Sequence, residues 1–242
     1  TDIIALLYPA LDRNLSGTAM EFFTSAAERA RQRGFKLVLW PGSNTAAEIA
    51  ELTATGIVDG VLLMEVQWVD ERVDVLQRGN TPFALIGRPQ DPQGMAWVDV
   101  DFASSVRSAV TQLVSLGHTS IAYASGQGER RFTHAGGARA LEAYRQAVAG
   151  LGLDEITFEF AETPRAGREL AARLREEHPE ATALIVMNEH AAPGVVIGLA
   201  QLGVSIPDDL SVISVGTSAN MAAMAEPSLT YMASPGAQLG RL

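Results

Sequence analysis

The chain has no cysteine among its 242 residues. This absence excludes disulfide bonds, thiolate catalysis and zinc sites with cysteine ligands, and it is typical of a reducing compartment. No apolar run reaches the ~18 residues that a membrane-spanning helix needs. Basic residues are also scarce, because 18 lysines and arginines oppose 28 aspartates and glutamates for a net charge of −10. We therefore expect that this chain does not grip a nucleic-acid backbone by itself.

Motifs for catalysis and cofactor binding are missing as well. The four histidines show no metal-ligand spacing, and the sequence contains no phosphate-binding loop. The segment Gly126-Gln127-Gly128 is only half of a dinucleotide fingerprint, because Arg131 stands where the third glycine belongs. Ser125 lacks the flanking glycines of a nucleophile elbow. The sequence therefore predicts no catalytic residue, no metal and no cofactor, and a protein that is not an enzyme.

What the chain does contain is a regular alternation of apolar strands and amphipathic helices. Residues 18–33, for example, carry apolar side chains at helical spacing, and Gly34 follows at the position where helices end. Strands that are apolar on both faces and alternate with helices indicate parallel sheets covered by helices. Expected strands lie at 3–8, 35–40, 61–64, 83–87, 97–100, 121–124, 156–160, 183–187 and 212–215.

The alternation restarts near Asp101, which indicates two similar lobes. We expect an N-terminal lobe over residues 1–101, completed by residues 231–242 and onwards, and a C-terminal lobe over residues 102–230. Thr1 is not a natural start, so we also expect a segment upstream of it.

The most informative stretch runs from Ala183 to Gly216. An apolar strand leads into Glu189, a helix then extends to Leu202, and a second buried strand follows. In parallel sheets, ligands bind at the carboxyl ends of the strands. This βαβ unit therefore places a carboxylate at an expected binding edge.

Several short segments, taken together and in order, resemble the effector-binding core of the LacI/GalR family of bacterial transcription regulators. They include Pro82 to Arg88, Leu116 to Ala122, Asn188-Glu189 and Leu202 to Val212. Further markers are segments 3–9 with Asn14, 34–35, 58–61, 98–101, Arg139 with 144–145, and 227–230. The resemblance covers nearly the whole chain.

The resemblance implies an α/β fold of two Rossmann-like lobes with parallel sheets, like that of type I periplasmic binding proteins. A small sugar-like effector would lie between the lobes, and its binding would act allosterically on the DNA-binding part. Complete members carry an N-terminal helix-turn-helix headpiece that binds operator DNA, and they are usually homodimers. We accordingly expect a cytoplasmic homodimer that contacts DNA through that headpiece and has no membrane partner.

The resemblance also assigns effector contacts. Arg139 matches the family arginine that reaches the effector, and its alternative is an arginine on a solvated helix face. Glu189 matches a position that binds sugar hydroxyls, and its alternative is an acid favoured at a helix amino terminus. Asp101 either bonds the ligand where the chain passes between lobes or caps the following helix.

Other candidates are less distinctive. Asp12 and Asn14 lie in the first strand-to-helix loop, where family members touch the effector. Glu65 and Arg88 end strands that face the expected cleft, with a simple Arg–Glu pair as the alternative. Phe160 is a candidate stacking ring or an ordinary core aromatic.

The apolar run from Met221 to Met224 is either part of a dimer interface or local packing.

Departures from the family pattern leave the effector open. Ser214-Val215-Gly216 lacks a second sugar-binding acid, and Glu162 stands where an aromatic is frequent. The effector is a hexose, a polyol, a sugar acid or a nucleoside, and the sequence favours none of these four. Two other functions also remain open, namely a type I solute-binding receptor of a sugar ABC transporter and a sugar-handling enzyme.

Overall fold

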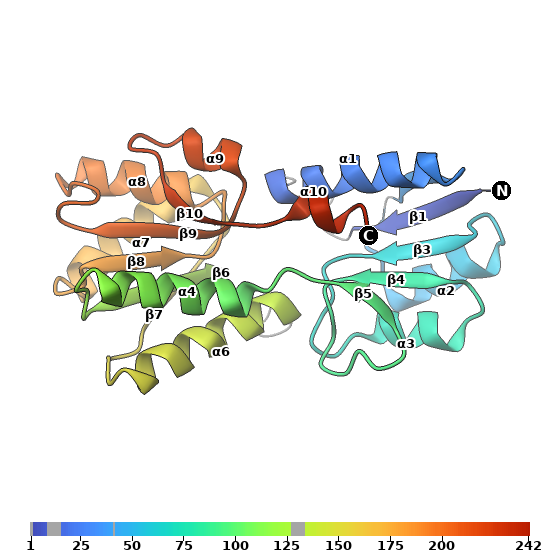
Figure 1. The fold of residues 1–242 in the computed structure, drawn as a ribbon, viewed down its shortest axis with the longest axis horizontal. Helices are drawn as coiled ribbons and strands as arrows, with labels where there is room; N and C mark the ends of the chain where they lie inside the picture. Colours follow the sequence, from blue (N-terminus) through green and yellow to red (C-terminus); the bar gives the residue numbers. More distant parts are fainter. Residues whose placement is uncertain (1, 9–15, 41, 127–133) are drawn as a thin grey trace. The chain divides into compact units, whose positions relative to one another are not determined.

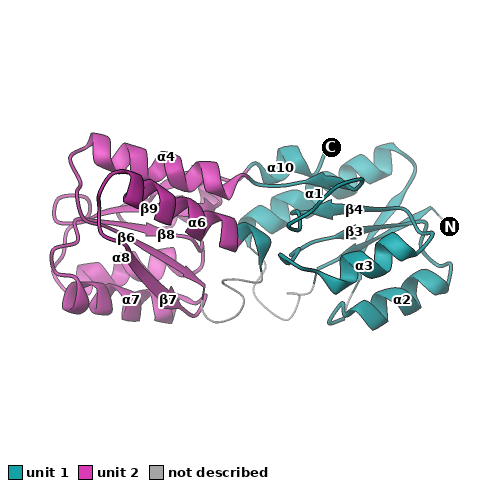
Figure 2. Cartoon of the chain, turned by 90° about the horizontal axis from the view of Figure 1, so that it is seen from below, with its two compact units in different colours: residues 1–100, 133–136, 235–242 teal, residues 101–132, 137–234 magenta. Residues whose placement is uncertain are grey.

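The computed structural model describes residues 2–8, 16–40, 42–126 and 134–242. The chain divides into two compact units (Figure 2). Unit 1 comprises residues 1–100, 133–136 and 235–242, and unit 2 comprises residues 101–132 and 137–234. Each unit contains one five-stranded sheet in which every pair of neighbouring strands is parallel. The expected α/β class with two Rossmann-like lobes is confirmed.

Unit 1 has the strand order β2-β1-β3-β4-β5. Figure 1 labels β1, β3, β4 and β5 of this sheet. Its strands are β1 (Ile3–Leu7), β2 (Lys36–Trp40), β3 (Gly60–Leu63), β4 (Phe83–Ile86) and β5 (Ala96–Val98). Its helices are α1 (Gly17–Gln32), α2 (Ala46–Ala54), α3 (Glu71–Arg78) and α10 (Gly236–Leu239). Leu6 packs with Phe22 of α1, whereas Leu7 packs with Ile49 of α2 and Leu76 of α3. Because neighbouring strand residues point to opposite faces, helices cover both faces of the sheet.

Local signals in the sequence set the starts of these helices. The Ser16 hydroxyl accepts the N–H of Ala19 at the start of α1. At α2, Thr45 and Glu48 form a reciprocal capping box. Such caps satisfy backbone N–H groups that have no partner within the helix. The helix expected at residues 18–33 begins within one residue of its expected position.

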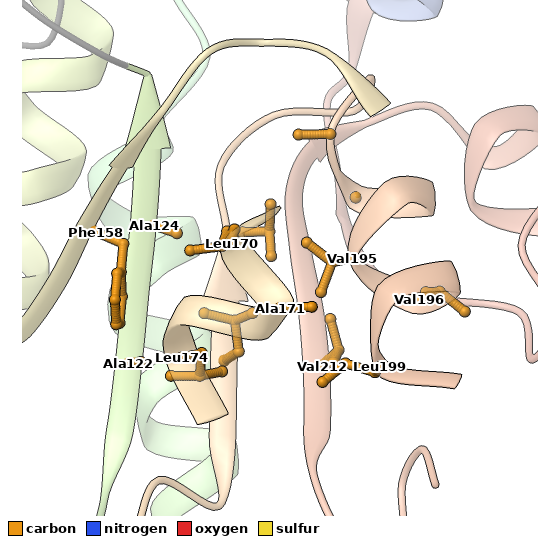
Figure 3. Packing of buried hydrophobic residues seen from close by; sticks show 14 of the residues in the cluster. Ala122, Ala124, Phe158, Leu170, Ala171, Leu174, Val195, Val196, Leu199 and Val212 are labelled. Carbon is orange, nitrogen blue, oxygen red and sulfur yellow. The ribbon is translucent and has the colours of Figure 1, made fainter. Parts of the chain in front are cut away.

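Unit 2 has the strand order β10-β9-β8-β6-β7. Its strands are β6 (Ile121–Gly126), β7 (Ile156–Phe160), β8 (Ala183–Val186), β9 (Ser211–Thr217) and β10 (Thr230–Ala233). Its helices are α4 (Phe102–Ser115), α6 (Ala135–Gly150, whose first two residues belong to unit 1), α7 (Pro164–Glu177), α8 (Ala192–Gln201) and α9 (Ala219–Ala223). One face of the sheet packs against α4 and α6, and the other against α7 and α8. Figure 3 shows the hydrophobic cluster between the sheet and helices α7 and α8, with Leu170 and Leu174 of α7 near Val195 and Leu199 of α8.

The end of the chain differs from the expectation that residues from 231 onwards complete the first lobe. Strand β10 pairs with β9 and so completes the sheet of unit 2. Only residues 235–242 belong to unit 1, where α10 packs on α1. The short apolar run Tyr231-Met232 fits the edge of either sheet by pattern alone. Periodicity could not decide between the two sheets, because it reports how a strand is buried and not which neighbour it pairs with.

No helix among the described residues combines the length and the apolarity needed to cross a bilayer.

Candidate functional site

The carboxyl ends of the strands in unit 2 gather buried polar side chains. Those of Ser125, Glu189, Thr217 and Ser218 are each less than 7% exposed and lie at or just beyond the ends of β6, β8 and β9. Since these strands are parallel, their carboxyl ends meet at one edge of the sheet, where ligands bind in open α/β folds. This strand-end edge of unit 2 is the candidate site.

Glu189 cross-links two neighbouring strand ends. Its carboxylate accepts the backbone N–H of Ser218 at 3.1 Å, and the residue is only 2% exposed. Ser218 is also the N-cap residue of α9. Because α8 begins only at Ala192, Glu189 lies in the turn before the helix rather than in its first turn. The carboxylate therefore holds the β9–α9 turn against the end of β8.

Asn188 also lies at this edge, and in the sequence it is only a marker of the family. Its side-chain oxygen accepts the N–H groups of His190 at 3.0 Å and Ala191 at 2.9 Å. An asparagine side chain commonly accepts the backbone N–H two residues further along the chain, which forms a turn. The proline at position 193, just inside α8, was the available sequence signal for a helix start here.

Two polar atoms near these strand ends have no hydrogen-bond partner within the described residues. They are the Ser125 hydroxyl, at the end of β6, and Nε2 of His190. A buried polar atom without a partner carries a desolvation cost, which a bound water or ligand can relieve. Neither residue was among the predicted contacts.

Glu162 lies directly over the end of β6. A Cβ built on Gly126 would be 2.7 Å from Oε1 of Glu162, so a larger residue at position 126 would require the end of the Glu162 side chain to move. At this edge, the Glu162 carboxylate thus stands at the position where the family pattern favours an aromatic ring.

The predicted contact Arg139 lies on α6 and is half-buried.

In unit 1, Glu65 follows the end of β3 and has a φ of 54°. This left-handed conformation is uncommon for residues other than glycine, asparagine and aspartate. The Glu65 carbonyl accepts Nη2 of Arg72 at 2.7 Å, and Arg72 in turn pairs with Asp70. The buried Asp70–Arg72 pair therefore contacts the backbone of the predicted contact Glu65 at its strained position.

Arg88 and Asp101 both have partners within their own units. Nε of Arg88 lies 3.5 Å from Asp99, and its guanidinium lies 5.3 Å from the centroid of the Trp97 ring. The Asp101 carboxylate accepts the N–H of Ser104 at 2.9 Å and caps α4. The capping role weighed for Asp101 is thus present, and Arg88 pairs with an aspartate instead of a glutamate.

The remaining candidates are scattered. Phe160 is 5% exposed and lies in the hydrophobic cluster between the sheet of unit 2 and α7, as a core aromatic does. Met221 is half-buried on α9, whereas the Met224 side chain that follows it is 75% exposed. Asp12 and Asn14 lie outside the described residues.

A cavity of about 270 Å³ lies in unit 1 beside α2. Its lining includes Trp40, Asn44, Glu48, Ile49 and Leu52. None of the predicted effector contacts lines it. Within the described residues, no group of three or more histidines and carboxylates is arranged to hold a metal ion.

Comparisons with known proteins place this geometry among bacterial regulators. Residues 110–242 match the family described as "periplasmic binding protein-like domain". Catabolite control protein A of Priestia megaterium is 28% identical over 186 residues, which are 76% of this chain and 55% of that protein. The HTH-type transcriptional regulator AglR of Rhizobium meliloti (strain 1021) is 30% identical over 201 residues, which are 80% and 55% of the two proteins. The chain thus spans about half the length of these curated relatives.

A solved structure shows the same fold. The regulatory protein of the LacI family from Chloroflexus aggregans superposes with a TM-score of 0.86 at 25% identity, over 99% of this chain and 87% of that one.

Proposed function

Because the chain belongs to the LacI/GalR family of transcriptional regulators and carries its periplasmic-binding-protein-like domain, we propose that it is the ligand-sensing domain of such a regulator. In this proposal the domain binds a small sugar-like effector between its two lobes and does no chemistry on it. Binding changes the conformation of the two-lobed domain. This change alters how an N-terminal helix-turn-helix domain binds operator DNA. A coupling of about 1–3 kcal/mol between the two sites is sufficient for such a switch.

The observation that carries the proposal is the edge of unit 2 where parallel strands end in polar residues. Ser125, Glu189 and Ser218 gather there, and Glu162 covers Gly126 at the same edge. Buried polar groups around a strand-end edge suit a ligand that has many hydroxyl groups. We propose Arg139 as the cationic contact from α6, with Glu65 and Asp101 as further polar contacts.

The same proposal sets the partners and the place of action. Operator DNA is contacted through the headpiece, because a chain of net charge −10 does not favour phosphate contacts by itself. The regulator acts as a homodimer in the cytoplasm, where operator DNA lies, and it has no membrane partner.

A thermal-shift screen against sugars, sugar acids, polyols and nucleosides tests the effector. A ligand at about 100 times its dissociation constant adds roughly 2.7 kcal/mol to the free energy of unfolding. Calorimetry with each hit then compares Arg139→Ala with Arg145→Ala. Arg145 is a suitable control, because it lies on the same helix and pairs with Glu155 at the surface.

We expect Arg139→Ala to weaken effector binding at least about tenfold, because a charge-assisted bond to the ligand is lost. Arg145→Ala should bind as the parent does. Equal affinities of the two variants would contradict the role given to Arg139.

The solute-binding receptor remains the second candidate because the fold serves it equally well. Such a receptor works as a monomer and has no DNA-binding part. Cloning the gene upstream of Thr1 and testing the whole product for salt-sensitive, sequence-specific DNA binding separates the two. Absence of any specific DNA binding by the whole product would favour the receptor.

A further inference from the structure

The cavity beside α2 in unit 1, which we call the α2 groove, has an apolar floor. The strand register places Leu7 of β1 beside Trp40 of β2, and both pack in the hydrophobic cluster between the sheet and α2. Ile49 and Leu52 line the groove from the helix, and together with Leu7 they are at most 5% exposed. Because β2 is the edge strand of the sheet, no other described strand covers the groove on the side of Trp40.

The rim of the α2 groove is negatively charged. Glu48 and Glu51 line it three residues apart on α2, so their side chains lie on the same side of the helix. They are the only charged residues among the described residues of the lining. Oε2 of Glu48 accepts the Thr45 N–H at 3.0 Å, whereas the Glu51 carboxylate forms no hydrogen bond or ion pair within the described part of the chain. At least one carboxylate is therefore available to a ligand.

Within the described residues, no cation of the protein neutralises this rim. Lys36 points to the same face of the sheet as Trp40, yet it forms an ion pair with neither Glu48 nor Glu51. Two like charges about one helical turn apart disfavour each other, and a bound cation relieves this repulsion. The rim therefore favours a positively charged group over a neutral or a negative one.

The α2 groove also has an aromatic wall and a small volume. Trp40 is half-buried, and an indole ring attracts an ammonium group over its face and stacks on other flat rings. The volume of about 270 Å³ lies just below the roughly 300–1,000 Å³ of most small-ligand sites. The groove thus has room for one aromatic ring with a short side chain.

We propose that the α2 groove binds a small aromatic amine. The ring of the ligand lies on Leu7, Ile49 and Leu52, and its ammonium group lies at the rim, within reach of Glu48 and Glu51. Burial of the ring and attraction between the ammonium and the carboxylates act together, so neither an aliphatic amine nor an aromatic acid satisfies both parts of the groove. The site lies within unit 1 and differs from the strand-end edge of unit 2, so it does not depend on the proposed function.

Titration of the isotope-labelled chain with phenethylamine, followed by NMR of its amide and indole groups, tests the site. Phenethyl alcohol and phenylpropionate are the matched probes, because they replace the ammonium by a hydroxyl or a carboxylate at similar size. We expect the amine to shift the resonances of residues 44–57 and of the Trp40 indole saturably, with a roughly millimolar dissociation constant for so small a ligand. The alcohol should bind at least about threefold more weakly, and the acid more weakly still.

Two variants at exposed helix positions separate the carboxylate from the rest of the groove. Glu51→Gln keeps the size of the side chain and removes its charge, so it should weaken phenethylamine roughly threefold and leave phenethyl alcohol unchanged. Glu71→Gln is the matched control, because Glu71 is exposed in the first turn of α3 and is not among the lining residues. It should bind both probes as the parent does. Raising the salt concentration from about 20 mM to about 500 mM should weaken only the amine.

Equal affinities for the three probes would overturn the proposal, because the rim would then not select a cation. An absence of shifts at residues 44–57 with the amine at about 10 mM would also overturn it, and so would equal affinities of Glu51→Gln and Glu71→Gln for the amine. Because neither effector nor DNA is present, these outcomes are separate from a failure of Arg139→Ala to alter effector binding, which would concern the proposed function alone.

Discussion

Tyr144 shows how a single buried hydroxyl links unfolding to pH. Its hydroxyl lies 2.8 Å from the Ile121 carbonyl and 3.0 Å from the Ile156 carbonyl, and it accepts the Ile156 N–H at 3.0 Å. The ring stacks on Tyr123 with centroids 5.0 Å apart. Burial, which disfavours the phenolate, raises the pKa of Tyr144 to about 12.

Because the pKa is raised in the folded state, the stabilisation is complete below the unfolded pKa of about 10 and is lost as the pH rises towards 12. We expect the free energy of unfolding to fall by about 2 kcal/mol across this window. Urea unfolding between pH 8 and 12 measures it. Tyr144→Phe should be less stable at pH 8 and should lack this part of the decline, whereas Tyr231→Phe should retain it. A decline of the same size in Tyr144→Phe would contradict the assignment.

Glu189 gives a second prediction for a single residue. Replacing it with alanine leaves the Ser218 N–H without its acceptor in a buried position, which costs about 1–3 kcal/mol. Glu189→Gln keeps an oxygen acceptor in nearly the same place and should lose less. Urea unfolding at pH 7 compares the two variants. Equal stability of the alanine variant and the parent would show that the bond contributes nothing to the fold.

The packing of α7 on α8 depends on glycines that let the two helix backbones meet. A Cβ on Gly194 would overlap the Pro164 carbonyl, and one on Gly198 would lie 2.9 Å from the Arg168 Cα. The contacting atoms belong to backbone, so they cannot rotate away as the end of a side chain can.

We expect Gly194→Ala to destabilise unit 2 by about 3 kcal/mol or more, or to prevent its folding, because the helices must separate. Gly150→Ala is the control, because a Cβ at that helical position meets nothing within 4 Å. It should be neutral or stabilising by up to about 1 kcal/mol. Thermal unfolding by circular dichroism measures both variants. Similar melting temperatures would show that the helices can separate at no cost.

At the scale of elements, the sequence predicted the features that a single kind of residue determines, namely the strands and the ends of helices. Apolar runs such as Ala183 to Met187 marked the strands, and glycines such as Gly34 marked the helix ends. The Asp70–Arg72 pair was not predictable, because charged residues at the start of a helix look like a solvated face until the fold buries them. Phe160 posed the reverse problem, since an aromatic at a strand end suits a core and a binding edge equally.

For the candidate site, the sequence predicted only the edge of the sheet at which it lies. Parallel topology places every strand end of unit 2 at one edge, and this brought Glu189 there from sequence alone. The bond from Ser218 to Glu189 joins residues 29 positions apart, so it depends on the register of β8 against β9. No local pattern encodes that register, and the choice between effector contact and structural cross-link could not be made from the sequence.

At the scale of the whole molecule, the proposed homodimer has a surface that can be tested. Met224 is 75% exposed and directly follows the short helix α9, on which Met221 lies. An aspartate placed in an apolar interface leaves a desolvated, unpaired charge, which costs several kcal/mol for each copy.

If this surface joins two copies, we expect Met224→Asp to shift the chain from dimer to monomer in sedimentation at micromolar concentration. Leu116→Asp is the matched control, because Leu116 is 66% exposed in the same unit and carries no proposed contact. It should sediment as the parent does. A parent dimer that survives Met224→Asp would move the interface away from α9, and a parent that sediments as a monomer would favour the receptor over the regulator.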